Sequence, residues 1–404
     1  MAKKKQIVRL PQPLPYQKDI LDWLEQEDIK FVSFLKSRQS GGSYLNKMLV
    51  VKWGLESNLN KIGYIVPTNK LGKLFYRELC NSLGPLIADS NSTDLLITFK
   101  SGSNVQFFSA ESGDSIRGFQ FTHTIIDEAA FMNENVFNLI IRPTFLIAGK
   151  KVILCSTPNG NKGFFYDYCQ YGLNNEKGYR TKMISIYDNP FIDKEEIELI
   201  KRQVPDLVFR QEYLGEFLDG SGTVFSNFRK CINDKPVKNG VYYAAIDWAK
   251  SNDYTVLTIM NSLKQVVYIW RITGMEYTQQ VKIISAKLNE WKPKITISEE
   301  NNIGAVINEL LKEQYKGFIR TVTLDNSFKK DMIENLVVGF EQGDITILDD
   351  DVLLRELQAF SCIYNHSTGT IKYSAPNGLH DDCVISLAYA YSLVKTKKGV
   401  YHVR

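Results

Sequence analysis

The amino-acid sequence predicts an α/β protein with two domains. Its 404 residues exceed the length over which one hydrophobic core usually keeps growing. Short apolar runs alternate with amphipathic stretches along most of the chain, without an internal repeat or a low-complexity tract. A hydrophobic content of 44% is typical of a globular protein. No apolar run approaches the roughly 20 residues that span a bilayer.

The first domain is predicted over residues 1–217, as a parallel sheet flanked by helices. Four short apolar runs end in polar residues, as buried parallel strands do. These runs are Lys61–Pro67, Asn104–Ser109, Thr122–Asp127 and Lys151–Ser156. Sequence containing glycine, serine and proline follows the domain and predicts a linker over residues 218–238.

The second domain is predicted over residues 239–404. Its strand-like runs are Val241–Asp247, Tyr254–Met260, Gln265–Trp270 and Lys294–Ser298. Three closely spaced strands, followed by alternating helices and strands, favour a ribonuclease-H-like sheet.

Cysteine content and charge say little about chemistry. The six cysteines form neither a CxxC pair nor a His/Cys cluster at zinc spacing, so we expect reduced thiols. The basic segment Met1–Arg9 is not followed by an apolar stretch, so we expect no secretory signal and a cytoplasmic protein. The net charge of +4 is weak evidence for a polyanionic partner.

A phosphate-binding loop is predicted at residues 36–43. The apolar run Lys30–Leu35 leads into Lys-Ser-Arg-Gln-Ser-Gly-Gly-Ser and an apparent helix from Tyr44. In this layout backbone N–H groups and a helix N-terminus face a phosphate, and a hydroxyl reaches its magnesium ion. The standard loop has lysine where Gly42 stands. A glycine turn that caps a helix at Ser43 is the alternative interpretation.

Two adjacent acids follow an apolar strand in the segment Thr124–Ala130. In a Walker B segment, Asp127 would hold magnesium through water and Glu128 would polarise the attacking water. A solvated turn also explains such a pair. The order of the two motifs in one chain is what favours a nucleotide site.

These segments resemble the ATPase domain of the terminase large subunits of tailed bacteriophages, from about residue 14 to residue 216. Ser37–Gly41 is similar to the variant phosphate loop of that family, and Leu14–Gln17 to its adenine-contacting segment. Ser115–Gly118 resembles its arginine-finger segment, and Cys155–Gly160 resembles its coupling motif. Phe209–Phe217 is also similar to the family.

The resemblance implies a role for each matched residue. Glu128 would act as the catalytic acid/base or orient the attacking water. Arg117 would stabilise the transferring phosphoryl group, within its own subunit or a neighbouring one. The implied nucleotide and magnesium contacts are Gln17 at the adenine, Ser37, Arg38, Gln39, Ser40, Gly41, Gly42 and Ser43 in the loop, Asp127 at the magnesium, and Ser156 and Thr157 as sensors of the γ-phosphate. A surface ion pair at Arg117 and a strand-to-turn cap at residues 156–157 remain as alternatives.

Gly42 departs from the family pattern. A lysine at this position would supply one charge-assisted hydrogen bond, worth roughly 1.5–3 kcal/mol. Three explanations stay open: a natural variant whose charge comes from Arg38, Lys36 or Lys47, a deliberate substitution, or a chain that does not hydrolyse ATP. We favour Arg38, and this choice predicts that Gly42→Lys leaves the activity similar or raises it.

Carboxylates at two strand ends and one helix start predict a metal site in the second domain. Asp247 ends one strand, Glu299 and Glu300 end another, and Asp381 and Asp382 begin a helix. Two-metal phosphodiester hydrolysis needs several converging carboxylates, and oxygen ligands suit Mg²⁺ or Mn²⁺ rather than zinc. Taken singly, the two aspartates at the helix start are also explained as caps.

Residues 240–395 also resemble the nuclease domain of large terminases. The matching motifs are Asp-Trp-Ala-Lys-x-x-Asp-Tyr-Thr, Glu-x-Asn-x-x-Gly and His-Asp-Asp. The implied metal ligands and catalytic groups are Asp247, Glu299, Asp381 and Asp382. The alignment selects Glu299 over Glu300, and it does not decide which aspartate of the third motif is the inner ligand. Asp253 would be an auxiliary acid or a turn former.

The resemblance implies a terminase large subunit that hydrolyses ATP to move viral double-stranded DNA into a procapsid and cuts the DNA concatemer with two metal ions. The implied cofactors are ATP with Mg²⁺ in the first domain and Mg²⁺ or Mn²⁺ in the second. The implied partners are viral DNA, the portal protein, the small terminase subunit and further copies in a ring, expected to be a pentamer. We expect these contacts on a procapsid in the host-cell cytoplasm, with no membrane involved.

Two other functional classes stay open. A repair or recombination nuclease fused to an ATPase would carry helicase motifs between Asn159 and Gly215, and the sequence lacks them. A DNA-binding subunit with a decayed ATPase is suggested by Gly42 alone. The candidate DNA contacts, which solvated faces also explain, are Lys329 and Lys330 beside Phe328, and Lys395, Lys397 and Lys398.

Overall fold

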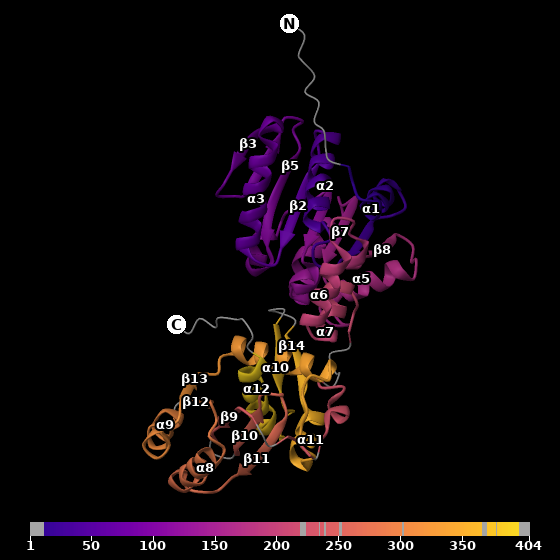
Figure 1. Cartoon of the computed structure of the whole chain (residues 1–404). Coiled ribbons are helices and arrows are strands. Elements are labelled where there is room, and N and C mark those ends of the chain that lie inside the picture. The colour runs from indigo at the N-terminus through magenta and orange to yellow at the C-terminus, as the bar shows by residue number, and fades with distance from the viewer. Residues whose placement is uncertain are drawn as a thin grey trace. The chain divides into compact units, whose positions relative to one another are not determined.

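The computed structural model describes residues 12–218, 224–233, 235–237, 240–249, 253–300, 303–365, 370–376 and 378–395 (Figure 1). The chain divides into two compact units. The first consists mainly of residues up to 219, and the second mainly of residues from 220 onward. Part of the predicted linker 218–238 lies outside the described residues, so the predicted boundaries at 217 and 239 stay predictions.

The first unit contains an eight-stranded, mostly parallel sheet in the order β3-β4-β5-β2-β6-β7-β1-β8. Only the pairs β3–β4 and β4–β5 are antiparallel. The strands are β1 (Phe31–Leu35), β2 (Lys61–Val66), β3 (Ile87–Asn91), β4 (Leu96–Phe99), β5 (Asn104–Ser109), β6 (His123–Asp127), β7 (Lys151–Ser156) and β8 (Tyr179–Met183). The four strands predicted from apolar runs are confirmed as β2, β5, β6 and β7.

Helices cover both faces of this sheet, because its central strands are apolar on both sides. They are α1 (Pro15–Glu25), α2 (Gly42–Glu56) and α3 (Asn69–Leu83) on one face, and α4 (Glu134–Val136) and α5 (Phe164–Leu173) on the other. Two further helices, α6 (Lys194–Gln203) and α7 (Asp206–Leu214), follow β8 in the chain. Ile125 packs into the core beneath α1, α2 and α3, whereas Ile126 packs into the core on the α5 side. Since strand residues alternate between faces, Asp127 at the end of β6 points to the α2 side.

The second unit contains a five-stranded sheet in the order β11-β10-β9-β12-β13. Its strands are β9 (Tyr242–Asp247), β10 (Thr255–Asn261), β11 (Val266–Ile272), β12 (Ile295–Glu299) and β13 (Ile319–Val322). The first three in sequence pair antiparallel, and β12 and β13 add in parallel. This mixed order confirms the ribonuclease-H-like prediction. A separate two-stranded sheet, β14 (Ser361–Asn365) and β15 (Thr370–Ser374), was not predicted.

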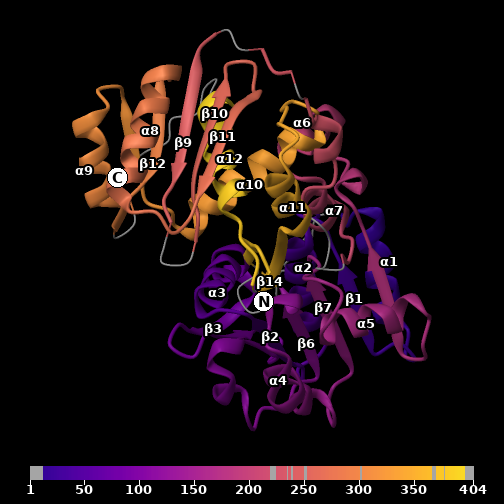
Figure 2. The same ribbon diagram turned by 90° about the horizontal axis from the view of Figure 1, so that it is seen from below.

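Helices flank both faces of the second sheet (Figure 2). They are α8 (Tyr277–Trp291) and α9 (Ile303–Gln314) on one face, and α10 (Asn326–Glu341), α11 (Asp351–Ala359) and α12 (Asp382–Lys395) on the other. Ala245 and Ile297 belong to the core on the α12 side. Asp247 and Glu299 follow them by two residues, so both strand-end acids point toward α12. Among the described residues, no helix is long and apolar enough to cross a membrane.

Candidate nucleotide and metal sites

The predicted phosphate loop joins β1 to α2, and the helix begins at Gly42 rather than Tyr44. Gly41 before it has a φ of 72°, a left-handed conformation that favours glycine. Its carbonyl accepts the first helical hydrogen bond, from the Leu45 amide at 3.0 Å. A Cβ atom on Gly41 would lie 2.8 Å from Nε2 of Gln17, so packing also requires glycine here.

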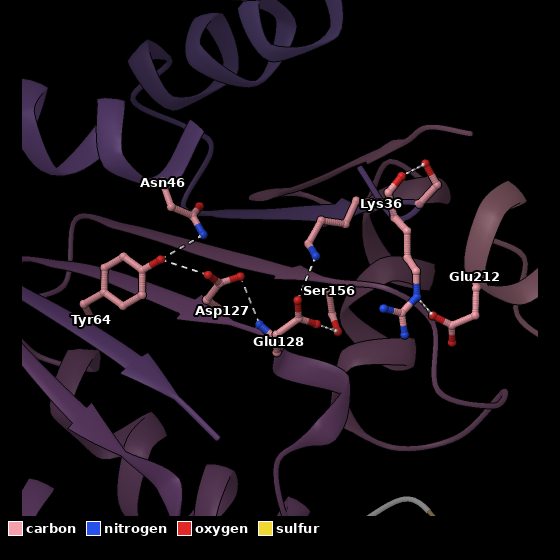
Figure 3. Close-up of polar contacts among 9 residues, drawn as sticks. Lys36, Asn46, Tyr64, Asp127, Glu128, Ser156 and Glu212 are labelled. Carbon is pink, nitrogen blue, oxygen red and sulfur yellow. Dashed lines mark hydrogen bonds and ion pairs between the residues drawn. The ribbon is translucent and has the colours of Figure 1, made fainter. Parts of the chain in front are cut away.

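The side chain of Lys36 occupies the space beside Gly42. A Cβ atom on Gly42 would lie only 2.6 Å from Cδ of Lys36 and 3.0 Å from Sγ of Cys155. Lys36 itself is only 8% exposed, and its Nζ lies 2.9 Å from Oε1 of Glu128 (Figure 3). The position that lacks a lysine in the sequence is therefore adjacent to a lysine side chain in space.

Lys36 stays charged in this environment. Burial lowers the pKa of its ammonium group, but the surrounding Cys155, Glu128 and Asp127 raise it, and the net change in pKa is upward. Such a buried ammonium group with a carboxylate partner is a strong, preformed contact for a phosphate.

The other two candidates for the missing charge are paired with other carboxylates. Arg38 donates from Nε to Oε2 of Glu212 at 2.8 Å, and its side chain is 62% exposed. Lys47 pairs with Glu78 at 2.5 Å. Lys36 is therefore the side chain that contacts the space beside Gly42, and compensation by Arg38 stays a prediction. The sequence could not rank these side chains, because the loop path decides which of them reaches Gly42.

The acidic pair at the end of β6 is split between two environments. Asp127 is 1% exposed, and it accepts hydrogen bonds from the Tyr64 hydroxyl at 2.9 Å and the Glu128 amide at 3.1 Å. Burial raises the pKa of Asp127, and the neighbouring Glu128 adds to the increase. Glu128 has a φ of 53°, unusual for a residue with a side chain, and Ser156 donates to its Oε2 at 3.4 Å.

A cavity of about 660 Å³ lies beside these groups. Its lining includes Lys36, Arg38, Gln39, Glu128 and Thr157, so the structure brings these predicted residues together. Ligand pockets of this general size hold small molecules such as nucleotides. Nearby, Oγ of Ser40 in the loop and Oδ1 of Asn46 in α2 are buried without a hydrogen-bond partner among the described residues. Unpaired groups of this kind fit a site that receives a polar ligand.

The remaining predicted nucleotide contacts differ in exposure. Ser37 is fully buried and donates to the Arg38 carbonyl, and Ser43 is exposed in the first turn of α2. Gln17 is 1% exposed: Oε1 accepts from the Leu14 amide at 2.9 Å, and Nε2 donates to the Gly41 carbonyl at 3.1 Å. Both polar atoms of the Gln17 amide are thus hydrogen-bonded to backbone groups, and adenine recognition by Gln17 stays a prediction.

Arg117 lies outside the lining of the cavity. Its Nε donates to Oδ1 of Asp114 at 2.8 Å, and its side chain is 60% exposed. The surface ion pair considered from the sequence is thus present. Its role as an arginine finger stays a prediction.

The second site gathers carboxylates at the ends of β9 and β12. Asp247 and Glu299 are 8% and 3% exposed, and their carboxyl groups are hydrogen-bonded to each other. Burial raises the pKa of Asp247 well above its ordinary value, and the negative charges of Glu299, Asp382 and Asp381 raise it further. Two acids held together in this way favour a divalent cation, which would relieve their repulsion.

Asp253 and His380 extend this acidic group. Nδ1 of His380 lies 3.4 Å from Oδ1 of Asp253 and 3.7 Å from Oδ2 of Asp382. One ligand atom from each of these three residues lies within 4.8 Å of the other two. Burial raises the pKa of Asp382 to about 7, and Glu356 and Asp253 contribute to the increase. His380 was not selected from the sequence, although the His-Asp-Asp motif contains it.

The two aspartates of that motif have different partners. Asp381 is 26% exposed in its side chain and lies 3.1 Å from Nζ of Lys329, whereas the side chain of Asp382 is 11% exposed. This geometry favours Asp382 as the inner ligand. Lys329, proposed from the sequence as a DNA contact, is engaged with Asp381, and Lys330 lies 3.9 Å from Glu334. The side chains of Lys395, Lys397 and Lys398 lie outside the described residues.

The Glu-x-Asn-x-x-Gly motif has a packing explanation. A Cβ atom on Gly304 would lie 2.7 Å from the Glu299 carbonyl oxygen, so only glycine lets α9 approach this strand end. Asn308 donates to the same carbonyl at 3.0 Å. Glu300 is exposed, which agrees with the selection of Glu299.

The first unit is a mostly parallel α/β unit with a phosphate loop and a strand-end acidic pair. The second is a ribonuclease-H-like unit with clustered carboxylates. This combination defines a class of two-part proteins with a candidate nucleotide site and a candidate metal site. Residues 33–230 match the family model described as terminase large subunit, T4likevirus-type, N-terminal. The chain belongs to the terminase large-subunit family.

Curated relatives agree with this assignment. The large terminase subunit of Thermus virus P23-45 is 27% identical over 318 residues, covering 72% of this chain and 65% of the relative. The large terminase subunit of Escherichia phage T5 is 29% identical over 225 residues, covering 54% and 51%. The chain thus spans less than two thirds of the length of the relatives it matches.

Solved structures agree on the fold. The large terminase of a thermophilic bacteriophage has a TM-score of 0.55 at 17% identity, covering 95% of this chain and 100% of that one. The same phage protein in complex with ADP has a TM-score of 0.54 at 18% identity, covering 95% and 99%.

Proposed function

We propose that this chain hydrolyses ATP to translocate viral double-stranded DNA into a procapsid and cleaves the DNA concatemer. The main support in the first unit is the Lys36–Glu128 contact at 2.9 Å beside Gly42, which supplies the charge that the loop sequence lacks. The main support in the second unit is the buried pair Asp247 and Glu299, together with the charge of the buried Asp382, which raises the pKa of Asp247.

For ATP hydrolysis, the residues around the cavity have different roles. Lys36 contacts the β- and γ-phosphates, and backbone N–H groups at the start of α2 hold the remaining phosphate oxygens. Glu128 orients the attacking water and accepts its proton, while Ser156 holds the Glu128 carboxylate in place. Asp127 and Ser43 would hold Mg²⁺, which would neutralise charge on the phosphates.

For DNA cleavage, Asp247, Glu299 and Asp382 would hold one divalent ion, and Asp253, His380 and Asp382 would hold a second. When bound, Mg²⁺ or Mn²⁺ would supply an activated water and charge stabilisation for the leaving oxygen of the phosphodiester. The oxygen ligands suit both ions, and the imidazole favours Mn²⁺ over Mg²⁺ at the second position.

The proposed partners follow from the family. They are viral DNA, the portal protein of the procapsid, the small terminase subunit and a ring of copies of this chain. The buried Lys36 ammonium beside Gly42 counts against the alternative of a decayed ATPase, which Gly42 alone suggested. The alternative of an ATPase fused to a repair nuclease differs from a packaging motor in one testable way. Its DNA-stimulated ATP hydrolysis would require no capsid.

The test measures ATP hydrolysis and plasmid cleavage on one preparation, with Mg²⁺ and with Mn²⁺. We expect Lys36→Met to lower hydrolysis strongly and leave cleavage unchanged, and Asp247→Asn to lower cleavage strongly and leave hydrolysis unchanged. Stimulation of hydrolysis by DNA and empty procapsids together tests packaging. Cleavage that persists in EDTA or in Asp247→Asn would contradict the proposed nuclease site.

A further inference from the structure

Glu356 is a buried carboxylate that no motif of the sequence explains. It lies in α11 and is only 6% exposed. A buried charge is stable only with hydrogen bonds or a counter-ion, and removing these partners costs folding free energy. Its contacts therefore indicate what the position is for.

Oε2 of Glu356 caps the start of α12. It accepts from the backbone amide of Cys383 at 2.8 Å and from that of Val384 at 3.3 Å. Amides in the first turn of a helix have no partner within the helix, and an anion there also interacts favourably with the helix dipole. Asp382 is the first residue of this turn, so Glu356 fixes the backbone that carries it.

The other carboxylate oxygen forms an ion pair with a residue of β11. Oε1 of Glu356 lies 3.3 Å from a terminal nitrogen of Arg271 in β11. The Arg271 guanidinium lies 3.4 Å above the ring of Tyr254, as a cation–π contact. The Tyr254 ring in turn meets the His380 ring edge-on, at 4.9 Å and 86°.

We propose that Glu356 and Arg271 are positioning residues for the metal site: Glu356 fixes Asp382 through the first turn of α12, and Arg271 fixes Glu356 and, through Tyr254, His380. This inference rests on the proposed nuclease function of the second unit. It assigns a role to two residues that lie 85 positions apart in the sequence and do not themselves bind metal.

The body of α12 is held independently of Glu356. Ser386 donates to the Ala245 carbonyl at 3.2 Å and bonds to the Thr258 hydroxyl at 2.9 Å, and the following apolar residues are fully buried against the sheet. Removal of the cap should therefore loosen the first turn, with Asp382, without undocking the helix.

The experiment compares Glu356→Ala with Glu356→Gln. Alanine removes the acceptor, whereas glutamine keeps an amide oxygen for the same two backbone N–H groups. Two readouts are measured: the Mn²⁺ concentration for half-maximal plasmid cleavage, and Mn²⁺ binding followed by electron paramagnetic resonance of the free ion. We expect Glu356→Ala to raise both concentrations about tenfold, and Glu356→Gln to stay within about threefold of the parent chain.

Glu334→Gln is the matched control, because this partly buried carboxylate of α10 bonds to the Tyr373 hydroxyl at 3.2 Å and to no residue of the metal site. It should leave both concentrations unchanged. Arg271→Ala is the second variant, in case Glu356→Ala does not fold, and should raise both about threefold.

Parent-like Mn²⁺ binding in folded Glu356→Ala would overturn the inference, as would a uniform loss of cleavage with unchanged Mn²⁺ dependence, which indicates a purely structural role. Equal impairment of Glu356→Gln would overturn the capping argument. A parent chain that binds Mn²⁺ but does not cleave DNA would contradict the proposed function alone, since the binding readout still tests the positioning residues.

Discussion

Replacement of Lys36 by methionine tests which side chain supplies the charge that Gly42 lacks. Methionine keeps an unbranched side chain against Gly42 and Cys155, so the packing changes little while the ammonium group is lost. A charge-assisted hydrogen bond contributes about 1.5–3 kcal/mol, so its loss from the transition state lowers kcat/KM about 10- to 150-fold. Because Lys36 is buried, solvent cannot replace this contact, and we expect the upper part of that range.

The assay is steady-state ATP hydrolysis with saturating Mg²⁺, with kcat and KM resolved separately. Lys47→Met is the matched control: it removes an ammonium group from α2 that pairs with Glu78, and should change kcat/KM less than twofold. Parent-like turnover in Lys36→Met, or a larger loss in Arg38→Ala than in Lys36→Met, would refute the reasoning.

The same geometry reverses the expectation from the sequence for Gly42→Lys. The sequence suggested that a lysine here would preserve or raise activity. In the structure even the first carbon of that side chain would lie 2.6 Å from Cδ of Lys36, and a second ammonium group would face the first. We therefore expect Gly42→Lys to lower ATP hydrolysis, and rescue by the added Lys36→Ala change, which removes the clashing side chain, would support a shared position.

Three further predictions concern the acidic groups. Tyr64→Phe removes the hydroxyl that donates to Asp127, so we expect the Mg²⁺ concentration for half-maximal ATP hydrolysis to rise about tenfold; Tyr168→Phe, a buried tyrosine of α5, should leave it unchanged. Asp247→Asn should lower plasmid cleavage at least roughly 100-fold with ATP hydrolysis retained, and residual cleavage near the parent rate would contradict the site. The pKa of Asp382 is raised to about 7, so the folded chain binds a proton there more tightly than the unfolded chain does. In EDTA, the Asp382 contribution to stability should therefore be present below about pH 4 and lost as the pH rises through about 7, and Asp382→Asn should flatten this part of the thermal unfolding profile.

Much of both sites was predictable because it is local in sequence. A strand end fixes where its next residue points, so apolar runs followed by Asp127, Asp247 and Glu299 were enough to place acids at sheet edges. The glycines of the phosphate loop predicted a tight turn into α2, and the prediction erred only by two residues at the helix start.

The choices that the sequence left open, and its omissions, concern contacts between distant segments. Arg38 and Lys36 are two residues apart and both basic, so composition could not separate them, whereas the path of the loop turns one toward Glu212 and the other toward Gly42 and Glu128. Glu356 carried no motif, because its partners come from α12 and β11.

The sequence by itself determined the two-part α/β architecture, the strand-end acids and the glycine turn, since each depends on hydrophobic periodicity and on the backbone freedom of single residues. Only the tertiary structure decided which lysine faces the phosphate loop, which aspartate of the His-Asp-Asp motif points inward, and which buried carboxylate caps α12. These choices depend on contacts between side chains of different helices and strands. An unpaired charge buried there costs folding free energy, so each buried charge lies against an oppositely charged or hydrogen-bonding partner.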